Sequence, residues 1–182
     1  MKKLLVSLMA IVMVLSMAAC GETKPADTTA AAGNTTTAAP DDTTGAAASD
    51  SFGAMILNEF RDLVSSSSDK SPMALANGIA NGGKLPFEPV VMEVEPGLLA
   101  GFDNYEVTGF EKGVTFGPMI GSIPFVAYVF ELSEGTDVNA FTEGLKEHAN
   151  LRWNICVEAD EIVSEAEGNI VFFMMCPDSV EG

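Results

Sequence analysis

Residues 21–50 contain no Val, Ile, Leu, Met, Phe, Trp or Tyr, and this gap limits where the chain can build a core. A segment without large apolar side chains buries too little surface to offset the conformational entropy that is lost on ordering. Every aromatic residue of the chain lies between positions 51 and 182. The sequence therefore predicts a single domain over 51–182, preceded by a disordered Thr- and Ala-rich linker over 20–50.

The N-terminus is typical of a secretory signal peptide. Two lysines follow Met1, and residues 4–19 form a weakly polar stretch that ends in small side chains. A stable transmembrane helix needs about 20 apolar residues, whereas here the chain becomes polar directly after Cys20. We therefore expect 1–19 to be a signal peptide rather than a permanent membrane span.

The segment Met17-Ala18-Ala19-Cys20 resembles the lipobox of bacterial lipoprotein precursors. That motif usually has Leu where this chain has Met17, a side chain of similar size and apolarity. The resemblance implies that Cys20 is acylated and anchors the protein to the extracytoplasmic face of the bacterial cell membrane. Two acyl chains give stable anchoring, because one chain binds a bilayer only reversibly. The alternative is an ordinary signal peptide, with Cys20 an unmodified thiol.

The charge balance narrows the classes of partner. The chain carries 26 Asp and Glu against 9 Lys and Arg, a formal net charge of −17 at pH 7. Such a charge repels the phosphates of nucleic acids and the headgroups of anionic lipids. We therefore expect no nucleic-acid partner, and we expect attachment to the membrane through acylated Cys20.

Three helices are predicted within the domain. Apolar residues recur at a spacing near 3.6 over 52–64, after Asp50 or Ser51 as N-cap. A second helix begins at Pro72 after Ser71 and stops at the glycines after residue 81. The third follows Thr136 or Asp137 and is the clearest amphipathic segment of the chain.

Alternating or short apolar runs predict strands, among them 90–94, 123–132 and 153–157, and a hairpin of 162–166 with 170–176. The run over 123–132 is the most hydrophobic and is expected at the centre of the sheet. The predicted order is ααβββαβββ. This order favours an α+β fold, with the helices on one face of a mainly antiparallel sheet.

Two passages carry a second, weaker resemblance. IPFVAYVFELSEGTDVNAFTEGLKEHANLRW and EGNIVFFMMC resemble segments of small uncharacterised lipoproteins of clostridial bacteria. The resemblance implies location and architecture only, because those proteins have no established activity.

Two cysteines, Cys156 and Cys176, fall in predicted strands of an exported chain. A disulfide between them would close a loop of about twenty residues and stabilise the fold by roughly 3 kcal/mol. Two buried free thiols are the equally open alternative.

No metal, cofactor or catalytic residue is predicted. The single histidine, His148, is expected as a surface or capping residue at the end of the third helix, where the helix dipole favours a cation. The Ser-x-x-Lys spacing from Ser67 to Lys70 lacks the companion motifs of penicillin-binding enzymes. An acidic cluster is expected to form a solvated rim rather than a Ca²⁺ site: Glu158, Asp160, Glu161, Glu165 and Glu167.

These features favour a non-enzymatic lipoprotein that binds or scaffolds an envelope protein through an exposed sheet edge or helix face. The first alternative is a small-ligand or Ca²⁺-binding lipoprotein that acts beside a transporter. The second is a cell-envelope hydrolase.

Overall fold

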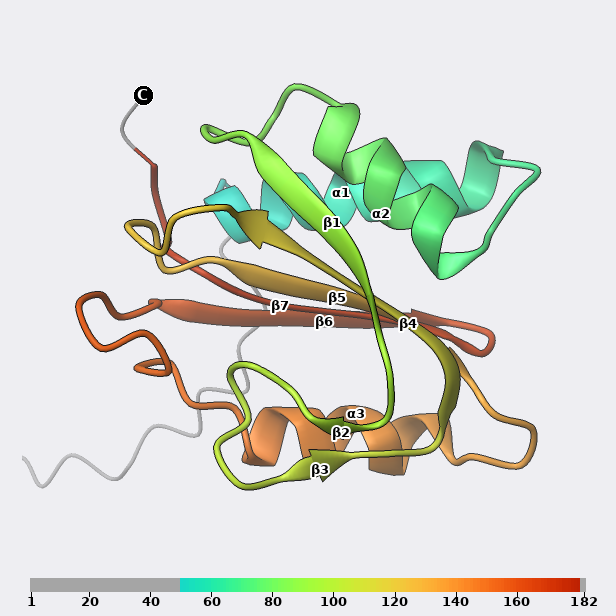
Figure 1. Ribbon diagram of the computed structural model, residues 1–182. Coiled ribbons are helices and arrows are strands. Elements are labelled where there is room, and N and C mark those ends of the chain that lie inside the picture. Colours follow the sequence, from blue (N-terminus) through green and yellow to red (C-terminus); the bar gives the residue numbers. More distant parts are fainter. Residues whose placement is uncertain (1–49, 181–182) are drawn as a thin grey trace, which may run out of the picture. The chain divides into compact units, whose positions relative to one another are not determined.

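The computed structural model describes residues 50–180, and in it a five-stranded antiparallel sheet is covered on both faces (Figure 1). Two helices lie on one face, and a third helix with a short hairpin lies on the other. The predicted α+β class with a mainly antiparallel sheet is confirmed. The predicted signal peptide, Cys20 and the predicted linker up to residue 49 lie outside the described residues. Within 50–180, no helix combines the length and the apolarity needed to cross a bilayer.

The first two helices, α1 (Phe52–Ser66) and α2 (Pro72–Asn81), each begin directly after a capping serine. The Ser51 hydroxyl accepts a hydrogen bond from the Ala54 N–H at 3.0 Å, and the Ser71 hydroxyl accepts one from the Ala74 N–H at 3.3 Å. Each hydroxyl satisfies one N–H that the first helical turn leaves without a partner. Of the two predicted caps of α1, Asp50 and Ser51, the structure therefore has Ser51, and the predicted cap of α2 at Ser71 is confirmed.

The third helix, α3 (Val138–Glu147), begins in the same way. The Asp137 carboxylate accepts a hydrogen bond from the Ala140 N–H at 2.9 Å. His148 is the C-cap residue, so the predicted capping position of the histidine is confirmed.

The large sheet has the strand order β1-β4-β5-β7-β6, with every neighbouring pair antiparallel. Its strands are β1 (Pro89–Val94), β4 (Phe110–Pro118), β5 (Val126–Leu132), β6 (Glu161–Glu167) and β7 (Ile170–Cys176). The separate hairpin pairs β2 (Gly97–Leu98) with β3 (Glu106–Val107). The expected central position of the most hydrophobic strand, β5, is confirmed.

Strand alternation divides the apolar side chains between two cores. On β5, Ala127 and Val129 belong to the core beneath α1 and α2, whereas Tyr128 and Phe130 belong to the core above α3. Successive residues of β7 divide in the same way, so Met174 and Met175 are both fully buried, one in each core. A strand with two buried faces needs an almost continuous apolar sequence.

The prediction that all helices lie on one face is wrong, because α3 packs on the face opposite α1 and α2. Phe141 of α3 meets Phe130 of β5 edge-on, with 5.3 Å between ring centroids. The physical reason is that β5 and β7 present apolar side chains on both faces, and each face must be covered.

The predicted strand over 153–157 is also wrong. Residues 151–160 contain turns and no strand; the Trp153 N–H donates to the Asn150 carbonyl and the Ala159 N–H to the Leu151 carbonyl. Ile155 is 95% exposed, so the alternation does not mark a buried face. β6 pairs with β7 as an outer strand, and the observed order is ααβββββαββ.

Candidate functional site

An apolar groove of about 380 Å³ lies on the α3 face of the sheet, at its β1 side. We call it the apolar groove. Its lining residues come from β1, β4, β5 and two connecting segments: Val90, Met92, Val94, Leu98, Leu99, Ala100, Thr115, Phe116, Gly117, Pro118, Phe125, Val126, Tyr128 and Trp153.

The groove exists because small residues of β4 meet larger residues of β1. In the strand register, Met92 lies opposite Thr115, and Val90 lies opposite Gly117. Residues that oppose each other in an antiparallel pair project from the same face of the sheet. Since α3 packs chiefly against β6 and β7, it leaves the β1 side of this face without a helix.

Hydrogen bonds fix one wall of the groove in place. The buried Tyr128 hydroxyl donates to the Ala100 carbonyl at 2.8 Å. The next carbonyl, that of Gly101, accepts from the Asn150 N–H at 2.8 Å. Burial raises the pKa of Tyr128 to about 12, against the smaller opposing effects of its hydrogen bonds, so the hydroxyl remains protonated and donating at neutral pH. The groove is therefore formed before any partner arrives.

Large apolar side chains are exposed in and beside the groove. Met92 and Leu98, which line it, are 56% and 63% exposed. Three more lie in two loops, one directly after Pro118 at the end of β4 and one that contains Trp153: Met119 at 77%, Ile120 at 74% and Ile155 at 95%. The Asn154 side-chain amide donates to the Gly121 carbonyl at 2.7 Å and holds these loops together. We call the groove with Met119, Ile120 and Ile155 the apolar surface.

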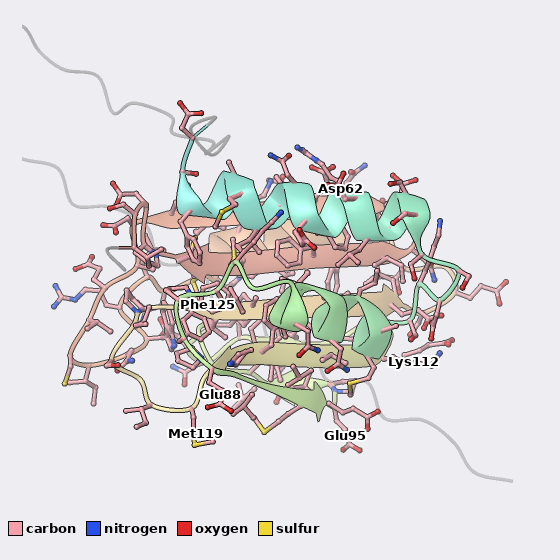
Figure 2. All side chains as sticks on the ribbon, turned by 90° about the horizontal axis from the view of Figure 1, so that it is seen from above. Asp62, Glu88, Glu95, Lys112, Met119 and Phe125 are labelled. Atoms are coloured by element: carbon pink, nitrogen blue, oxygen red, sulfur yellow. The ribbon has the colours of Figure 1, made fainter. Side chains whose placement is uncertain are left out.

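The outer edge of β1 borders the groove and is open. Among the described residues, no backbone hydrogen bond outside the sheet and no side-chain hydrogen bond involves residues 89–94. Three exposed carboxylates, those of Glu88, Glu93 and Glu95, flank this edge and form no ion pair within 50–180. Figure 2 shows Glu88 and Met119 beside one end of β1 and Glu95 at the other.

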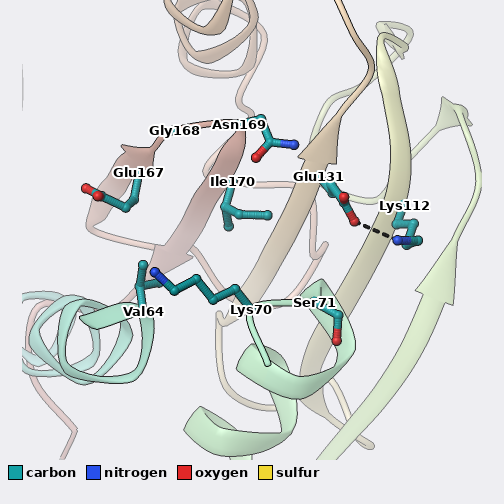
Figure 3. Close-up of a pocket in the computed structure, with 9 residues that line it drawn as sticks. All are labelled: Val64, Lys70, Ser71, Lys112, Glu131, Glu167, Gly168, Asn169 and Ile170. Carbon is teal, nitrogen blue, oxygen red and sulfur yellow. Dashed lines mark hydrogen bonds and ion pairs between the residues drawn. The ribbon is translucent and has the colours of Figure 1, made fainter. Parts of the chain in front are cut away.

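A polar pocket of about 460 Å³ lies toward the opposite end of β5 (Figure 3). We call it the polar pocket; it is lined by Val64, Lys70, Ser71, Lys112, Glu131, Glu167, Gly168, Asn169 and Ile170. Lys112 donates to Glu131 at 2.8 Å, and this hydrogen bond raises the pKa of Lys112. Lys70 forms no ion pair with any described residue, whereas the other five Lys and Arg side chains of 50–180 each do.

Cys156 and Cys176 are both free thiols in the structure, which therefore has no disulfide between them. Cys156 is exposed in the turns that replace the predicted strand, whereas Cys176 is buried on β7 beneath α1. The alternative of two buried thiols is therefore correct for Cys176 alone. Burial raises the pKa of the Cys176 thiol well above its usual range, and the nearby Glu161 carboxylate adds to the shift.

The carboxylates of the acidic cluster bind different partners and do not form one site. Glu161 accepts from the Gly53 N–H at 2.9 Å, Glu165 accepts from Arg61 at 2.7 Å, and Glu158 pairs with Arg152 at 3.4 Å. Across residues 50–180, no three His, Cys, Asp or Glu side chains are placed to hold a metal ion together.

His148 makes the contacts expected of a capping residue. Its Nδ1 lies 2.9 Å from the Gly144 carbonyl oxygen, and its ring stacks on Tyr105 with 4.0 Å between centroids. Ser67 of the Ser-x-x-Lys spacing donates its hydroxyl to the Asp69 carbonyl at 2.7 Å.

Sequence reasoning missed the apolar surface. The signal was present in Met119 and Ile120, two large apolar residues between Pro118 and Gly121, where proline and glycine indicate a turn. Large apolar residues in a turn have no strand or helix face to bury them, and such residues are candidates for contact with a partner.

Comparisons with protein-family models, with curated proteins and with solved structures give no match. The features of the structure that bear on function are therefore the apolar groove, the open edge of β1 and the polar pocket.

Proposed function

We propose that this chain is a lipoprotein held on the extracytoplasmic face of a bacterial cell membrane by acylated Cys20, with a non-enzymatic domain that binds another envelope protein. The observation that carries the binding role is the apolar surface. Five of the six exposed large hydrophobic residues within 50–180 belong to it: Met92, Leu98, Met119, Ile120 and Ile155.

The apolar surface has the properties of a binding site in energetic terms. Fully burying one large apolar side chain stabilises a complex by roughly 1.5–3 kcal/mol, so a few such residues supply most of a binding free energy. The wall fixed by Tyr128 and Asn150 needs no ordering on binding, which reduces the entropic cost of association.

Photo-cross-linking in intact cells tests the binding role. A photoreactive amino acid replaces Leu98 in the groove, and a matched variant carries it at Met55 on α1, which is 37% exposed and lies on the other face. We expect a discrete protein adduct from position 98 and none from position 55. Identical adduct patterns from the two positions would contradict a specific apolar surface.

The anchor is tested separately by Cys20→Ser. This change removes the acylation site, and we expect the protein to leave the membrane fraction, because the anchoring energy of about 0.8 kcal/mol for each buried methylene is lost. The control, Cys156→Ser, keeps the anchor and stays in the membrane fraction. A Cys20→Ser protein that remains in the membrane would refute the lipoprotein assignment.

A second candidate function is small-ligand binding at the polar pocket, beside a transporter. The observation that favours it is Lys70, a cation on the pocket wall without an ion-pair partner among the described residues. Thermal unfolding with a panel of sugars, peptides and cell-wall fragments tests it. A ligand at a hundred times its Kd adds about 2.7 kcal/mol to the free energy of unfolding. Lys70→Met should abolish that gain, and Lys146→Met on α3 should keep it.

A further inference from the structure

We infer that the apolar surface binds an extended, basic segment of the partner protein, which adds as a sixth strand to the open edge of β1. This inference rests on the proposed function and specifies the chemistry of its partner. Three observations carry it: the open backbone of β1, the alternation of its side chains beside the groove, and the carboxylates along its edge.

The backbone of β1 provides the first argument. An outer strand directs every second pair of N–H and C=O groups away from the sheet, where they can pair with another strand. Within 50–180 these groups of residues 89–94 have no partner outside the sheet. Pro89 has no N–H to donate, so pairing with a new strand begins after it.

Alternation along β1 provides the second argument. Val90, Met92 and Val94 line the groove, whereas Val91 packs against the core on the other face. An added strand would also place alternate side chains over the groove, at intervals of about 6.8 Å. The segment that fits has apolar residues at every second position, which the exposed Met92 and Leu98 would help to bury.

The charges provide the third argument. Glu88, Glu93 and Glu95 are exposed beside this edge and form no ion pair with any described residue. At the other edge of the sheet, on β6, Glu161 and Glu165 are already bonded to α1 through the Gly53 N–H and Arg61. The free carboxylates beside β1 therefore favour Lys or Arg at the remaining positions of the added strand.

The same charges disfavour the other occupants. A second copy of the chain would bring Glu88, Glu93 and Glu95 against their own counterparts, in a protein with net charge −17. Residues 21–50 contain no large apolar side chain to place in the groove. An anionic bilayer surface meets the same repulsion as a second copy.

Designed peptides test strand addition on the full-length chain in mild detergent. The probes are a nine-residue peptide of alternating Lys and Val, its Glu and Val counterpart, and the Lys peptide N-methylated at every second residue. We expect the Lys peptide to bind at least about tenfold more tightly than either of the others, because it alone offers both charge and backbone complementarity. Bound Lys peptide should also slow amide hydrogen exchange within residues 90–94.

Matched variants locate the interaction. The double change Glu93→Gln with Glu95→Gln should reduce severalfold the ratio of the affinity for the Lys peptide to that for the Glu peptide. Glu134→Gln with Glu147→Gln, also at exposed positions without ion pairs among the described residues, should leave it unchanged. Equal affinity for the Lys and Glu peptides, or unchanged binding after N-methylation, would overturn the inference.

The remaining outcomes separate this inference from the proposed function. If the chain sediments as a dimer and its β1 amides are protected from exchange without peptide, the occupant of the edge is a second copy of the chain. Protection of β1 by phosphatidylcholine vesicles, but not by the Lys peptide, would make it a bilayer. If position 98 still cross-links to a protein in cells while the Lys peptide fails to bind, strand addition is wrong and the protein-binding role stands.

Discussion

Single residues of the segment before β3 set the shape of the apolar groove. Gly101 adopts φ +93°, a left-handed conformation that favours glycine, and a Cβ there would overlap the Met175 methyl group. The Tyr128 hydroxyl donates a hydrogen bond to the carbonyl of the neighbouring residue, Ala100. The shape of the groove wall therefore depends on the absence of a side chain at Gly101 and on the buried hydroxyl of Tyr128.

Gly101→Ala tests the close approach. The left-handed backbone costs a side-chain-bearing residue about 1–2 kcal/mol, and the overlap with Met175 adds roughly 1–3 kcal/mol. Gly135→Ala is the matched control, since Gly135 has φ +84° but no atom within 4 Å of its added Cβ. Denaturant unfolding of both variants should show the larger loss for Gly101→Ala, and equal losses would refute the steric argument.

Tyr128 predicts a loss of stability in alkali. Burial raises its folded pKa from 10.0 to about 12, so the stabilisation that it contributes is complete below pH 10 and is lost as the pH rises toward 12. The shift corresponds to roughly 2–3 kcal/mol.

Tyr128→Phe should cost about 1–2 kcal/mol at neutral pH because it leaves the Ala100 carbonyl unpaired. Its unfolding free energy should fall less steeply than that of the unaltered protein from pH 10 to about 12. Parallel curves for the two proteins would contradict the assignment.

At the scale of elements, apolar packing rather than ion pairing holds α1 against the sheet. Phe60 is 1% exposed and stacks on Phe172 of β7 with 4.9 Å between ring centroids. Arg61, the next residue, forms an exposed two-point contact with Glu165 of β6. Exposed ion pairs contribute about 0–1 kcal/mol, whereas removing a buried aromatic ring costs about 3–5 kcal/mol.

Two adjacent substitutions separate these contributions. We expect Phe60→Ala to lower the free energy of unfolding by about 3–5 kcal/mol and Arg61→Ala by less than about 1 kcal/mol. Chemical denaturation at low and high salt is the measurement, because only the Arg61 effect should shrink with salt. A larger loss for Arg61→Ala would mean that the ion pair holds the helix.

At the scale of the molecule, charge and layering act on different properties. The two cores need a sheet with apolar side chains on both faces, and the net charge of −17 keeps the polar exterior acidic. Like charges at the surface repel one another and oppose the compact state. The five ion pairs within 50–180 are largely exposed and offset little of this repulsion.

Added salt should therefore stabilise the protein. Raising NaCl from about 10 mM to about 150 mM shortens the screening length from about 30 Å to about 8 Å. We expect the thermal midpoint of the full-length chain to rise, because screened repulsion outweighs weakened ion pairs. A midpoint that falls with salt would show that the ion pairs dominate.

The sequence alone determined the features that depend on a few neighbouring residues. The cap at Ser71 and the central place of β5 were predicted correctly, and the caps at Ser51 and Asp137 were each predicted to within two neighbouring residues, because capping and hydrophobic runs are encoded locally. The alternation over 153–157 misled, because an alternating run forms a strand only when a neighbouring strand is available to pair with it.

The tertiary structure alone decided which faces meet. Contacts between distant segments decide the place of α3 on the second face, the burial of Cys176 and the apolar groove. The groove joins β1, residues 98–100, β4, β5 and Trp153, and no short window of sequence contains them together. Periodicity shows that a side chain lies on a face, but only packing shows whether that face is covered.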